Sequence, residues 1–356
     1  MSIEAYLYCA NGHDRAVELD RTVVDALDDQ QLLWINVEGC DSDTAARLGD
    51  LLAVAPGLFD RLCGDRPVRH LDNFGDHYSF AIETPKRRRK PGNADDPPQD
   101  DNAFEPSSPS RSADGRDSHP GGQGSLRAAR LGFVVGPRWL VTIHLEPIEF
   151  LRGFRKQDKG ETRIGSLSPS LLVASLLDWH LSEFLHAVSI IERDADALDE
   201  KILAAGTQSD ILERVVAIRR SVSELRLLIA RQRPVFHGLS RPDFALNADE
   251  RAAAHFATLA DRFDRAVDEV ERSRDVVHGS FDLFTSMTTQ QTNELVKALT
   301  FLTALIGACA AVAGLLGMNF KMPFFDTGAT GFIEVTVGLI ITGVVAVVWA
   351  RYRRWI

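Results

Sequence analysis

The sequence predicts an α+β membrane protein, in which an N-terminal α/β domain is followed by a long helical stalk and two C-terminal transmembrane helices. Three observations support this prediction. Short apolar runs alternate with turn residues over roughly the first 168 positions. From Pro169 onward the pattern becomes that of amphipathic helices. Charged residues, 25% of the chain, are almost absent from 298–319 and 335–350. A chain of 356 residues is also long enough for two or three structural units.

The N-terminal domain, residues 1–168, is predicted as α/β with a modest sheet. Runs rich in Val, Ile, Phe and Trp favour strands, because branched and aromatic side chains suit a pleated surface. The predicted strands are LLWINVEG, YSFAIET, LGFVVG and WLVTIHL. Helical spacing of apolar residues instead predicts helices in DTAARLGDLLAV and GLFDRLCG.

A polar segment at 86–126 interrupts this domain. Pro, Gly, Ser, Asp and Arg exclude almost every apolar residue from it. Such a composition cannot bury enough surface to offset its chain entropy, so we predict a disordered insertion. Its basic block, 86–90, could bind anionic lipid or nucleic acid. A solvated loop edge is the favoured reading, and no nucleic-acid partner is expected.

The helical domain and stalk, residues 169–296, contain three long apolar-periodic runs. The first covers 170–203, the second 210–239, and the third begins near Asn247 and shows no stop before the uncharged region; Gly279 is its only weak point. A helix of about seventy residues would reach on the order of 100 Å. Its apolar stripe consists of Phe256, Leu259, Phe263, Val267, Val270, Val277, Phe281 and Phe284. We expect neighbouring helices, including those of other subunits, to cover so long a stripe.

The C-terminal region, 297–356, contains two segments long enough to cross a bilayer. About 20 apolar residues in a helix span a hydrocarbon core of roughly 30 Å. We predict transmembrane helices at about 297–318 and 331–350, the second with Glu334 near its start. A hairpin buried in a soluble core is the alternative, although runs of about 10 to 14 residues suit that arrangement better.

The charges beside these segments predict their orientation. Lys297 precedes the first segment, and Arg351, Arg353 and Arg354 follow the second. Basic residues collect on the cytoplasmic side of membrane proteins. Both termini of a multi-pass protein of the cytoplasmic membrane are therefore expected in the cytoplasm. The first residues show neither the basic start nor the apolar core of a signal peptide.

The sequence contains no signature of an enzyme. It lacks GxxxxGK[ST], HExxH and GxSxG, and no GxGxxG follows a predicted strand. His180 and His186 are six residues apart on a predicted helix and would not share a face. We therefore expect a protein that is not an enzyme and has no cofactor. The scattered cysteines, with no CxxC pair, are expected to stay reduced without a disulfide or zinc site; they are Cys9, Cys40, Cys63 and Cys309.

The junction between stalk and first span carries a family resemblance. Residues 273–320 read SRDVVHGSFDLFTSMTTQQTNELVKALTFLTALIGACAAVAGLLGMNF and include the tripeptide Gly317, Met318 and Asn319. A Gly-Met-Asn motif at the exit of the penultimate span, before a short loop and one last span, resembles the CorA family of divalent metal ion transporters. The likeness extends weakly into the N-terminal domain and includes the basic tail RYRRWI.

The resemblance implies a funnel-shaped homopentamer in the lipid bilayer, whose first spans line a central pore. It implies passage of Mg²⁺, and of Co²⁺ or Ni²⁺ behind it, down the electrochemical gradient. Helical spacing independently places small or hydroxylated residues on one face of the first span, although such faces also serve helix packing. Asp282 and Asn293 resemble positions that line the cytoplasmic funnel in the family, and Val296 and Leu299 could form an apolar constriction. The predicted pore-lining residues are therefore Asp282, Asn293, Val296, Leu299, Thr300, Thr303, Gly307, Ala310 and Gly314.

Asn319 is the residue that we predict to contact the hydrated ion. Mg²⁺ holds its water shell tightly and prefers octahedral oxygen ligation. Five neutral amide carbonyls could accept hydrogen bonds from these waters and still release the ion, as conduction requires. Asp282 is a second predicted metal contact. Asn319 also suits a helix C-cap, and the two roles are compatible.

Some positions depart from the family pattern. Lys321 lies close to the predicted pore mouth, and Gly307 stands where members can carry a bulky apolar gate. Zinc transport of the ZntB branch, with or without proton coupling, therefore stays open, as does a tethering protein without transport. Candidate regulatory metal contacts, for which a salt-bridged helix face is the alternative, are the segment 194–200 and Asp261, Asp264 and Asp268.

Overall fold

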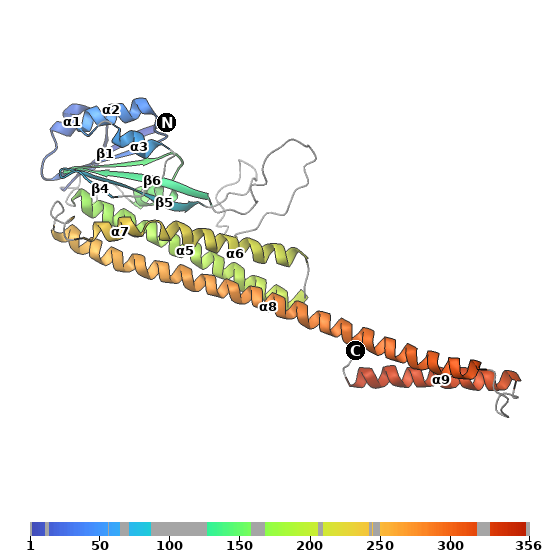
Figure 1. Ribbon diagram of the computed structural model, residues 1–356. Coiled ribbons are helices and arrows are strands. Elements are labelled where there is room, and N and C mark those ends of the chain that lie inside the picture. The colour runs from blue at the N-terminus through green and yellow to red at the C-terminus, as the bar shows by residue number, and fades with distance from the viewer. Residues whose placement is uncertain are drawn as a thin grey trace. The chain divides into compact units, whose positions relative to one another are not determined.

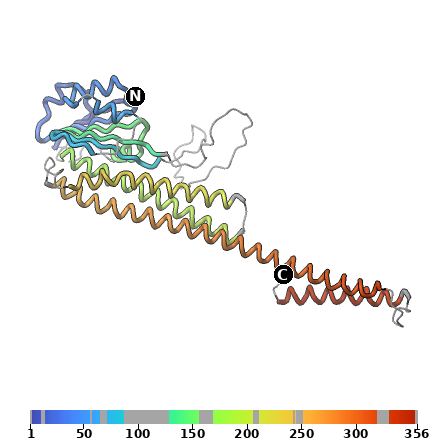
Figure 2. Tube along the Cα trace, in the orientation of Figure 1, coloured from blue at the N-terminus to red at the C-terminus, as the bar shows by residue number. Residues whose placement is uncertain are grey.

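The computed structural model describes residues 2–10, 14–55, 57–64, 71–86, 127–157, 168–205, 209–241, 244, 250–318 and 328–353. The chain divides into two compact units. The first comprises Met1–Leu198 with Glu213–Ser280, and the second comprises Asp199–Leu212 with Phe281–Ile356. Figure 2 traces the chain from blue at the N-terminus to red at the C-terminus. The predicted insertion lies outside the described residues from position 87 onward, and Lys86 is the last residue of a strand.

The first unit contains a seven-stranded sheet in the order β2-β1-β3-β7-β6-β5-β4. Only the central pair, β3 and β7, is parallel; the other neighbours are antiparallel. The four strands predicted from the sequence are confirmed as β3, β5, β6 and β7. The strands are β1 (Ser2–Cys9), β2 (Arg15–Val17), β3 (Gln31–Glu38), β4 (Asp72–Asn73), β5 (Tyr78–Lys86), β6 (Arg127–Val135) and β7 (Trp139–His144).

Three short helices cover one face of this sheet (Figure 1). They are α1 (Arg21–Asp25), α2 (Ser42–Leu52) and α3 (Leu58–Cys63), and the last two were predicted from their spacing. Asp41 caps α2 by accepting a hydrogen bond from the backbone N–H of Thr44 at 2.9 Å. The core under these helices is apolar and includes Leu33, Ile35, Val37, Leu48, Phe59, Leu62, Val141 and Ile143.

The opposite face of the sheet is aromatic and partly polar. Trp34 of β3 packs edge-on against Phe154 of α4 (Glu149–Gln157). The indole N–H of Trp34 donates to the Thr142 hydroxyl at 3.0 Å, and that hydroxyl donates to the side-chain amide oxygen (Oδ1) of Asn36 at 2.8 Å. His144 lies 3.1 Å from the same oxygen. These buried polar groups form hydrogen bonds with one another, which allows them to lie in the protein interior.

The helices that follow are α5 (Pro169–Ala205), α6 (Ser209–Ala230), α7 (Arg233–Leu239) and α8 (Glu250–Gly317). The first unit holds α5 up to Leu198, α6 from Glu213, all of α7, and α8 up to Ser280. The single helix predicted over 210–239 is wrong, because the chain turns at 231–232 and α7 starts anew. Pro234, in the first turn of α7, has no N–H to donate to an uninterrupted helix. Gly279 does not break α8.

Much of the apolar stripe of α8 is buried within this one chain. Phe256, Phe263, Val270 and Val277 are each 2% exposed or less. Phe263 stacks on Phe236 of α7, with ring centroids 4.4 Å apart. The neighbouring helices that were expected to cover the stripe therefore belong, in this part, to the same chain, where α5, α6 and α7 pack with α8 (Figure 1).

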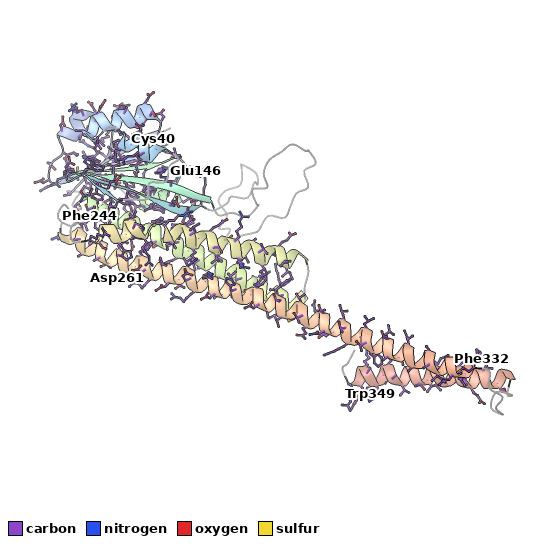
Figure 3. The ribbon with its side chains drawn as sticks, viewed as in Figure 1. Cys40, Glu146, Phe244, Asp261, Phe332 and Trp349 are labelled. Atoms are coloured by element: carbon purple, nitrogen blue, oxygen red, sulfur yellow. A yellow bond between two sulfur atoms is a disulfide. The ribbon has the colours of Figure 1, made fainter. Side chains whose placement is uncertain are left out.

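The second unit contains Asp199–Leu212 together with the rest of α8 and the helix α9 (Gly328–Tyr352). Both are long and apolar enough to cross a membrane, and their apolar windows are not buried within the chain. Phe332 and Trp349 project from opposite ends of α9 (Figure 3). The composition of α5 also meets the criterion for a span, but 56% of its apolar window is buried inside the protein. We accordingly treat α5 as a core helix.

Candidate functional site

The predicted pore residues lie on the part of α8 that belongs to the second unit. Within 298–317 of α8, the less exposed positions recur at helical spacing and mark the face that α9 covers; they are Ala298, Phe301, Leu305, Cys309 and Leu316. The matching positions of α9 are Gly331, Val335, Leu339, Gly343, Ala346 and Ala350. Figure 1 shows the two helices running alongside each other. Small residues on α9 allow such close approach in an apolar medium.

The predicted small and hydroxylated face lies on the opposite side of α8. At about 100° per residue, the positions from Asn293 to Gly314 centre roughly 180° from the covered face. Each of these predicted residues is exposed in the single chain: Asn293, Val296, Thr300, Thr303, Gly307, Ala310 and Gly314. Leu299 is also exposed and lies toward the edge of this face. This face is thus available to line a pathway, because α9 does not occupy it.

Hydroxyl groups on this face donate inward to the helix backbone. Thr300 donates to the Val296 carbonyl at 2.7 Å, and Thr303 donates to the Leu299 carbonyl at 2.8 Å. With the proton so engaged, the oxygen lone pairs remain as acceptors. Such a surface offers neutral acceptors to the water shell of a cation.

Toward the N-terminal end of α8, the same face continues into a polar groove. Asp282 and Asn293, both predicted, are among its lining residues. Thr285, Ser286 and Thr289 also line it and were missed in the sequence analysis. The signal for them was available, because they continue the three- and four-residue spacing in a segment with no charge between Asp282 and Glu294.

Glycines give this face open space within the chain. A Cβ atom built on Gly307, Gly314 or Gly317 would meet nothing within 4 Å. Their lack of a side chain is therefore not required by packing inside one subunit. Gly307 stands where members of the family can carry a bulky apolar gate, and here the chain has room for a larger residue.

The Gly-Met-Asn motif coincides with the end of α8. The helix ends at Gly317, and the N–H of Met318 donates to the Leu315 carbonyl at 3.4 Å. Met318 is exposed. Asn319 and Lys321 lie outside the described residues, so the predicted amide ring stays a prediction.

The candidate regulatory carboxylates lie in different surroundings. Asp264 accepts a hydrogen bond from His237 Nε2 at 3.2 Å and lies 3.5 Å from Arg233, as in the salt-bridged alternative. Burial raises the pKa of Asp194 to about 6, although Arg214 and Arg193 oppose this. Among the described residues, no three His, Cys, Asp or Glu side chains are grouped so that they could hold a metal ion. Regulatory metal contacts between subunits stay a prediction.

Comparison with known proteins decides the family. A family model described as CorA-like Mg²⁺ transporter protein matches residues 116–353. The chain belongs to the CorA family. The predicted resemblance is therefore confirmed, and it covers the helical bundle, the stalk and both apolar helices of this CorA chain.

Individual relatives of this CorA chain carry different ions in their names. The cobalt/magnesium transport protein CorA of Thermotoga maritima is 26% identical over 185 residues, which are 52% of each protein. The zinc transport protein ZntB of Yersinia enterocolitica is 23% identical over 188 residues, 52% of this chain and 54% of that protein. The chain thus matches about half the length of these relatives.

A solved structure shares the fold of this CorA chain over its full length. The CorA magnesium transporter of Methanocaldococcus jannaschii superposes with a TM-score of 0.72 at 16% identity, covering 100% of both chains. The N-terminal α/β domain and long helices predicted from the sequence are therefore confirmed as a CorA fold.

Proposed function

We propose that the protein is a homopentameric channel that passes hydrated divalent cations across the cytoplasmic membrane, with Mg²⁺ as the main cargo. One observation carries the proposal: a continuous polar and small face of α8 runs from Asp282 to Gly314 opposite the face that α9 covers. Five copies of this face around an axis would enclose a pathway lined by neutral polar and small groups, with a ring of Asp282 carboxylates at one end. The outer apolar side chains of α9 would then contact lipid.

Each part of the pathway has a separate role in this proposal. The carboxylate of Asp282 attracts cations at the cytoplasmic end, and the hydroxyls of Thr300 and Thr303 accept hydrogen bonds from the ion's waters. Asn319 forms the neutral ring at the outer mouth. Because Mg²⁺ dehydrates reluctantly, contact through its water shell permits faster passage than direct carboxylate ligation.

The end of α9 supports the proposed orientation. Arg353 lies over the Trp349 ring, with its guanidinium carbon 5.6 Å from the ring centroid. Trp and Tyr favour the membrane interface, and arginine favours its cytoplasmic side. Lys297, at the start of the first span, would lie on the same side of the membrane as Arg353, so both support a cytoplasmic C-terminus.

Replacing Asn319 by alanine is expected to reduce initial Mg²⁺ uptake about ten-fold, since the ion's waters lose their acceptors at the mouth. The measurement is uptake into proteoliposomes that contain the purified full-length protein. Thr336→Ala on α9 is the control, because Thr336 is exposed and lies outside the proposed pathway. Wild-type uptake by the Asn319→Ala variant would contradict the amide ring.

The same liposomes separate the ion specificities. Mg²⁺ entry that is independent of a pH gradient supports the magnesium channel. Zinc entry that grows with the proton gradient would instead support the ZntB-like function, which the zinc transport relative favours as the second candidate. If neither ion enters the liposomes, the result would support a membrane-tethered protein without transport. Native mass spectrometry in mild detergent tests the pentamer, and a monomer or dimer would contradict the shared pore.

A further inference from the structure

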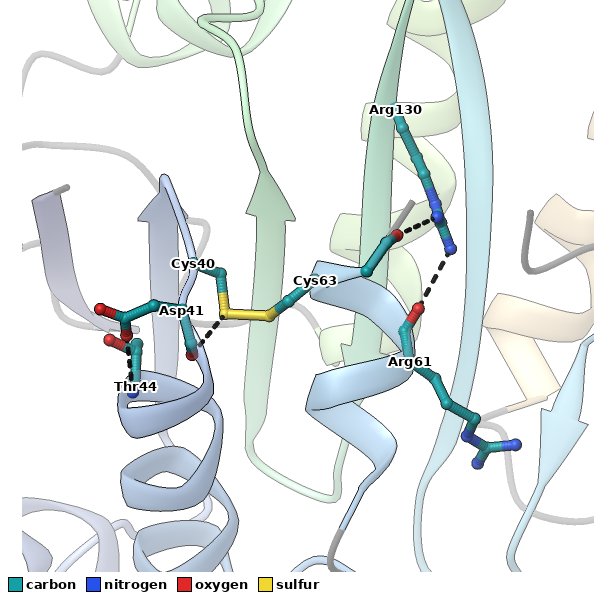
Figure 4. Close-up of a disulfide and its surroundings, with 7 residues drawn as sticks. Cys40, Asp41, Thr44, Arg61, Cys63 and Arg130 are labelled. Carbon is teal, nitrogen blue, oxygen red and sulfur yellow. Dashed lines mark hydrogen bonds between the residues drawn. A yellow bond between two sulfur atoms is a disulfide. The ribbon is translucent and has the colours of Figure 1, made fainter. Parts of the chain in front are cut away.

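The structure contains a disulfide that the sequence analysis did not predict. Cys40 and Cys63 are bonded, with their Cα atoms 5.5 Å apart. The expectation that all four cysteines stay reduced is wrong for this pair, because the fold brings together two residues 23 positions apart. Cys9 and Cys309 are free. The bond joins the connection between β3 and α2 to the end of α3 (Figure 4).

The position of this bond conflicts with the compartment proposed for the domain. Cytosolic thiols keep most cysteine pairs reduced, and persistent disulfides belong to oxidising compartments. Both cysteines are only half-buried and lie at the edge of the apolar core, not within it. Among the described residues, no third His, Cys, Asp or Glu joins the pair to form a metal site. The pair is therefore suited to thiol–disulfide exchange.

A second set of contacts, separate from the disulfide, holds α3 on the sheet. The Arg130 guanidinium on β6 donates to the Gly64 carbonyl at 2.7 Å and to the Arg61 carbonyl at 3.3 Å (Figure 4). These carbonyls lie at the C-terminal end of α3, where a cation is favourable. Leu62 lies against Gly132 of the same strand, where an added Cβ would meet its side chain at 3.2 Å. The helix is thus attached to the sheet by polar and apolar contacts in addition to the covalent bond.

We propose that Cys40 and Cys63 form a reversible redox pair, open in the reducing cytoplasm and closed by small-molecule disulfides under oxidative conditions, that adjusts the stability of the α2–α3 layer. In reduction, one thiolate of a glutathione-type thiol attacks a sulfur of the pair and forms a mixed disulfide while the other cysteine leaves as a thiolate. A second thiol then releases the first cysteine and gives a small-molecule disulfide. Two electrons pass from the two thiols to the protein pair, and the cysteine thiolates take up the protons that the two thiols lost.

The test uses the full-length protein with Cys9→Ser and Cys309→Ser, so that the pair contains its only cysteines. The protein is equilibrated without denaturant in buffers of reduced and oxidised glutathione, quenched with acid and labelled with a mass-tagged maleimide. We expect full, reversible conversion between dithiol and disulfide. Reduction should lower the Tm by about 5 to 10 °C, because opening the loop restores entropy to the unfolded chain.

Arg130→Gln separates the contribution of the Arg130 hydrogen bonds to α3 from that of the disulfide. Its effect on Tm should be about twice as large in the reduced protein as in the oxidised protein, since the disulfide no longer holds the helix end. The matched control is Arg130→Gln combined with Cys40→Ser, which cannot form the disulfide. In this background Arg130→Gln should lower the Tm by the larger amount in both buffers. A pair that stays closed in excess reduced glutathione, or stays open in oxidised glutathione, would overturn the proposal. Equal Arg130→Gln effects in both states would overturn the link to α3.

The proposal rests on the cytoplasmic placement given under the proposed function, so the same labelling is applied to growing cells. We expect a dithiol during growth and a disulfide after addition of a membrane-permeant disulfide. A permanent disulfide in unstressed cells would overturn the redox pair. Ion uptake is recorded separately in liposomes, so loss of flux counts against the channel alone, and the thiol state counts for or against the redox pair alone.

Discussion

Gly307→Leu is expected to reduce Mg²⁺ uptake to the level of empty liposomes. Gly307 lies on the exposed face of α8, and a Cβ at this position meets nothing within 4 Å in the chain. The substitution therefore causes no clash inside one subunit, and leucine also favours a helix more than glycine does. In a shared pore, five leucine side chains would converge at one level and exclude a hydrated ion by size and by dewetting.

Gly338→Leu provides the matched control for this prediction. Gly338 is exposed on α9, and a Cβ there also meets nothing within 4 Å. In the proposed pentamer this position faces lipid, so uptake should stay at the wild-type level. Equal uptake by both variants would contradict a pathway along the α8 face, whereas loss in both would indicate a general effect of leucine in these helices. Size-exclusion chromatography and native mass spectrometry verify that each variant assembles like the wild type.

Acidification is expected to destabilise the first unit by roughly 3 kcal/mol through His180 alone. His180 of α5 is fully buried, and burial lowers its pKa to about 4. Its Nε2 lies 2.8 Å from the Gln232 side-chain oxygen, while the Gln232 amide nitrogen donates to the carbonyls of Glu83 and Leu228. The amide oxygen must therefore accept, so Nε2 carries the proton of a neutral imidazole.

The sign of this effect follows from where the protons bind. Unfolded histidine takes up a proton near its ordinary pKa of about 6.5, whereas folded His180 does so only near 4. Its contribution to stability is present above about pH 6.5 and is lost as the pH falls through 4. Burial also lowers the pKa of His144, which acts in the same direction. The raised pKa of Asp194 acts in the opposite direction.

A His180→Phe variant isolates the contribution of this residue. The variant should unfold at a lower temperature than the wild type at pH 7, because the Gln232 oxygen loses its donor. Its Tm should also fall less between pH 7 and pH 4, measured by near-ultraviolet circular dichroism on the full-length protein. His186→Phe, at an exposed histidine of the same helix, should keep the wild-type pH dependence. An unchanged pH dependence in His180→Phe would contradict the assignment.

The sequence determined the features that depend on local pattern. Alternating and branched apolar runs predicted β3, β5, β6 and β7, and helical periodicity predicted α2, α3, α5 and the unbroken α8. The uncharged segments predicted two apolar helices, and the Gly-Met-Asn motif after the first of them indicated the CorA family. Helical spacing was sufficient to place the candidate pore residues on one face, because side-chain direction in a helix follows directly from residue number.

Tertiary structure decided the features that depend on residues distant in the chain. The pattern of 210–239 did not locate the turn before α7, and it did not show that α5, α6 and α7 bury the stripe of α8 around Phe263. The pairing of Cys40 with Cys63 depends on how α3 packs on the sheet. The availability of the pore face likewise depends on which side of α8 is covered by α9. Periodicity states which residues share a face, but only packing decides what that face contacts.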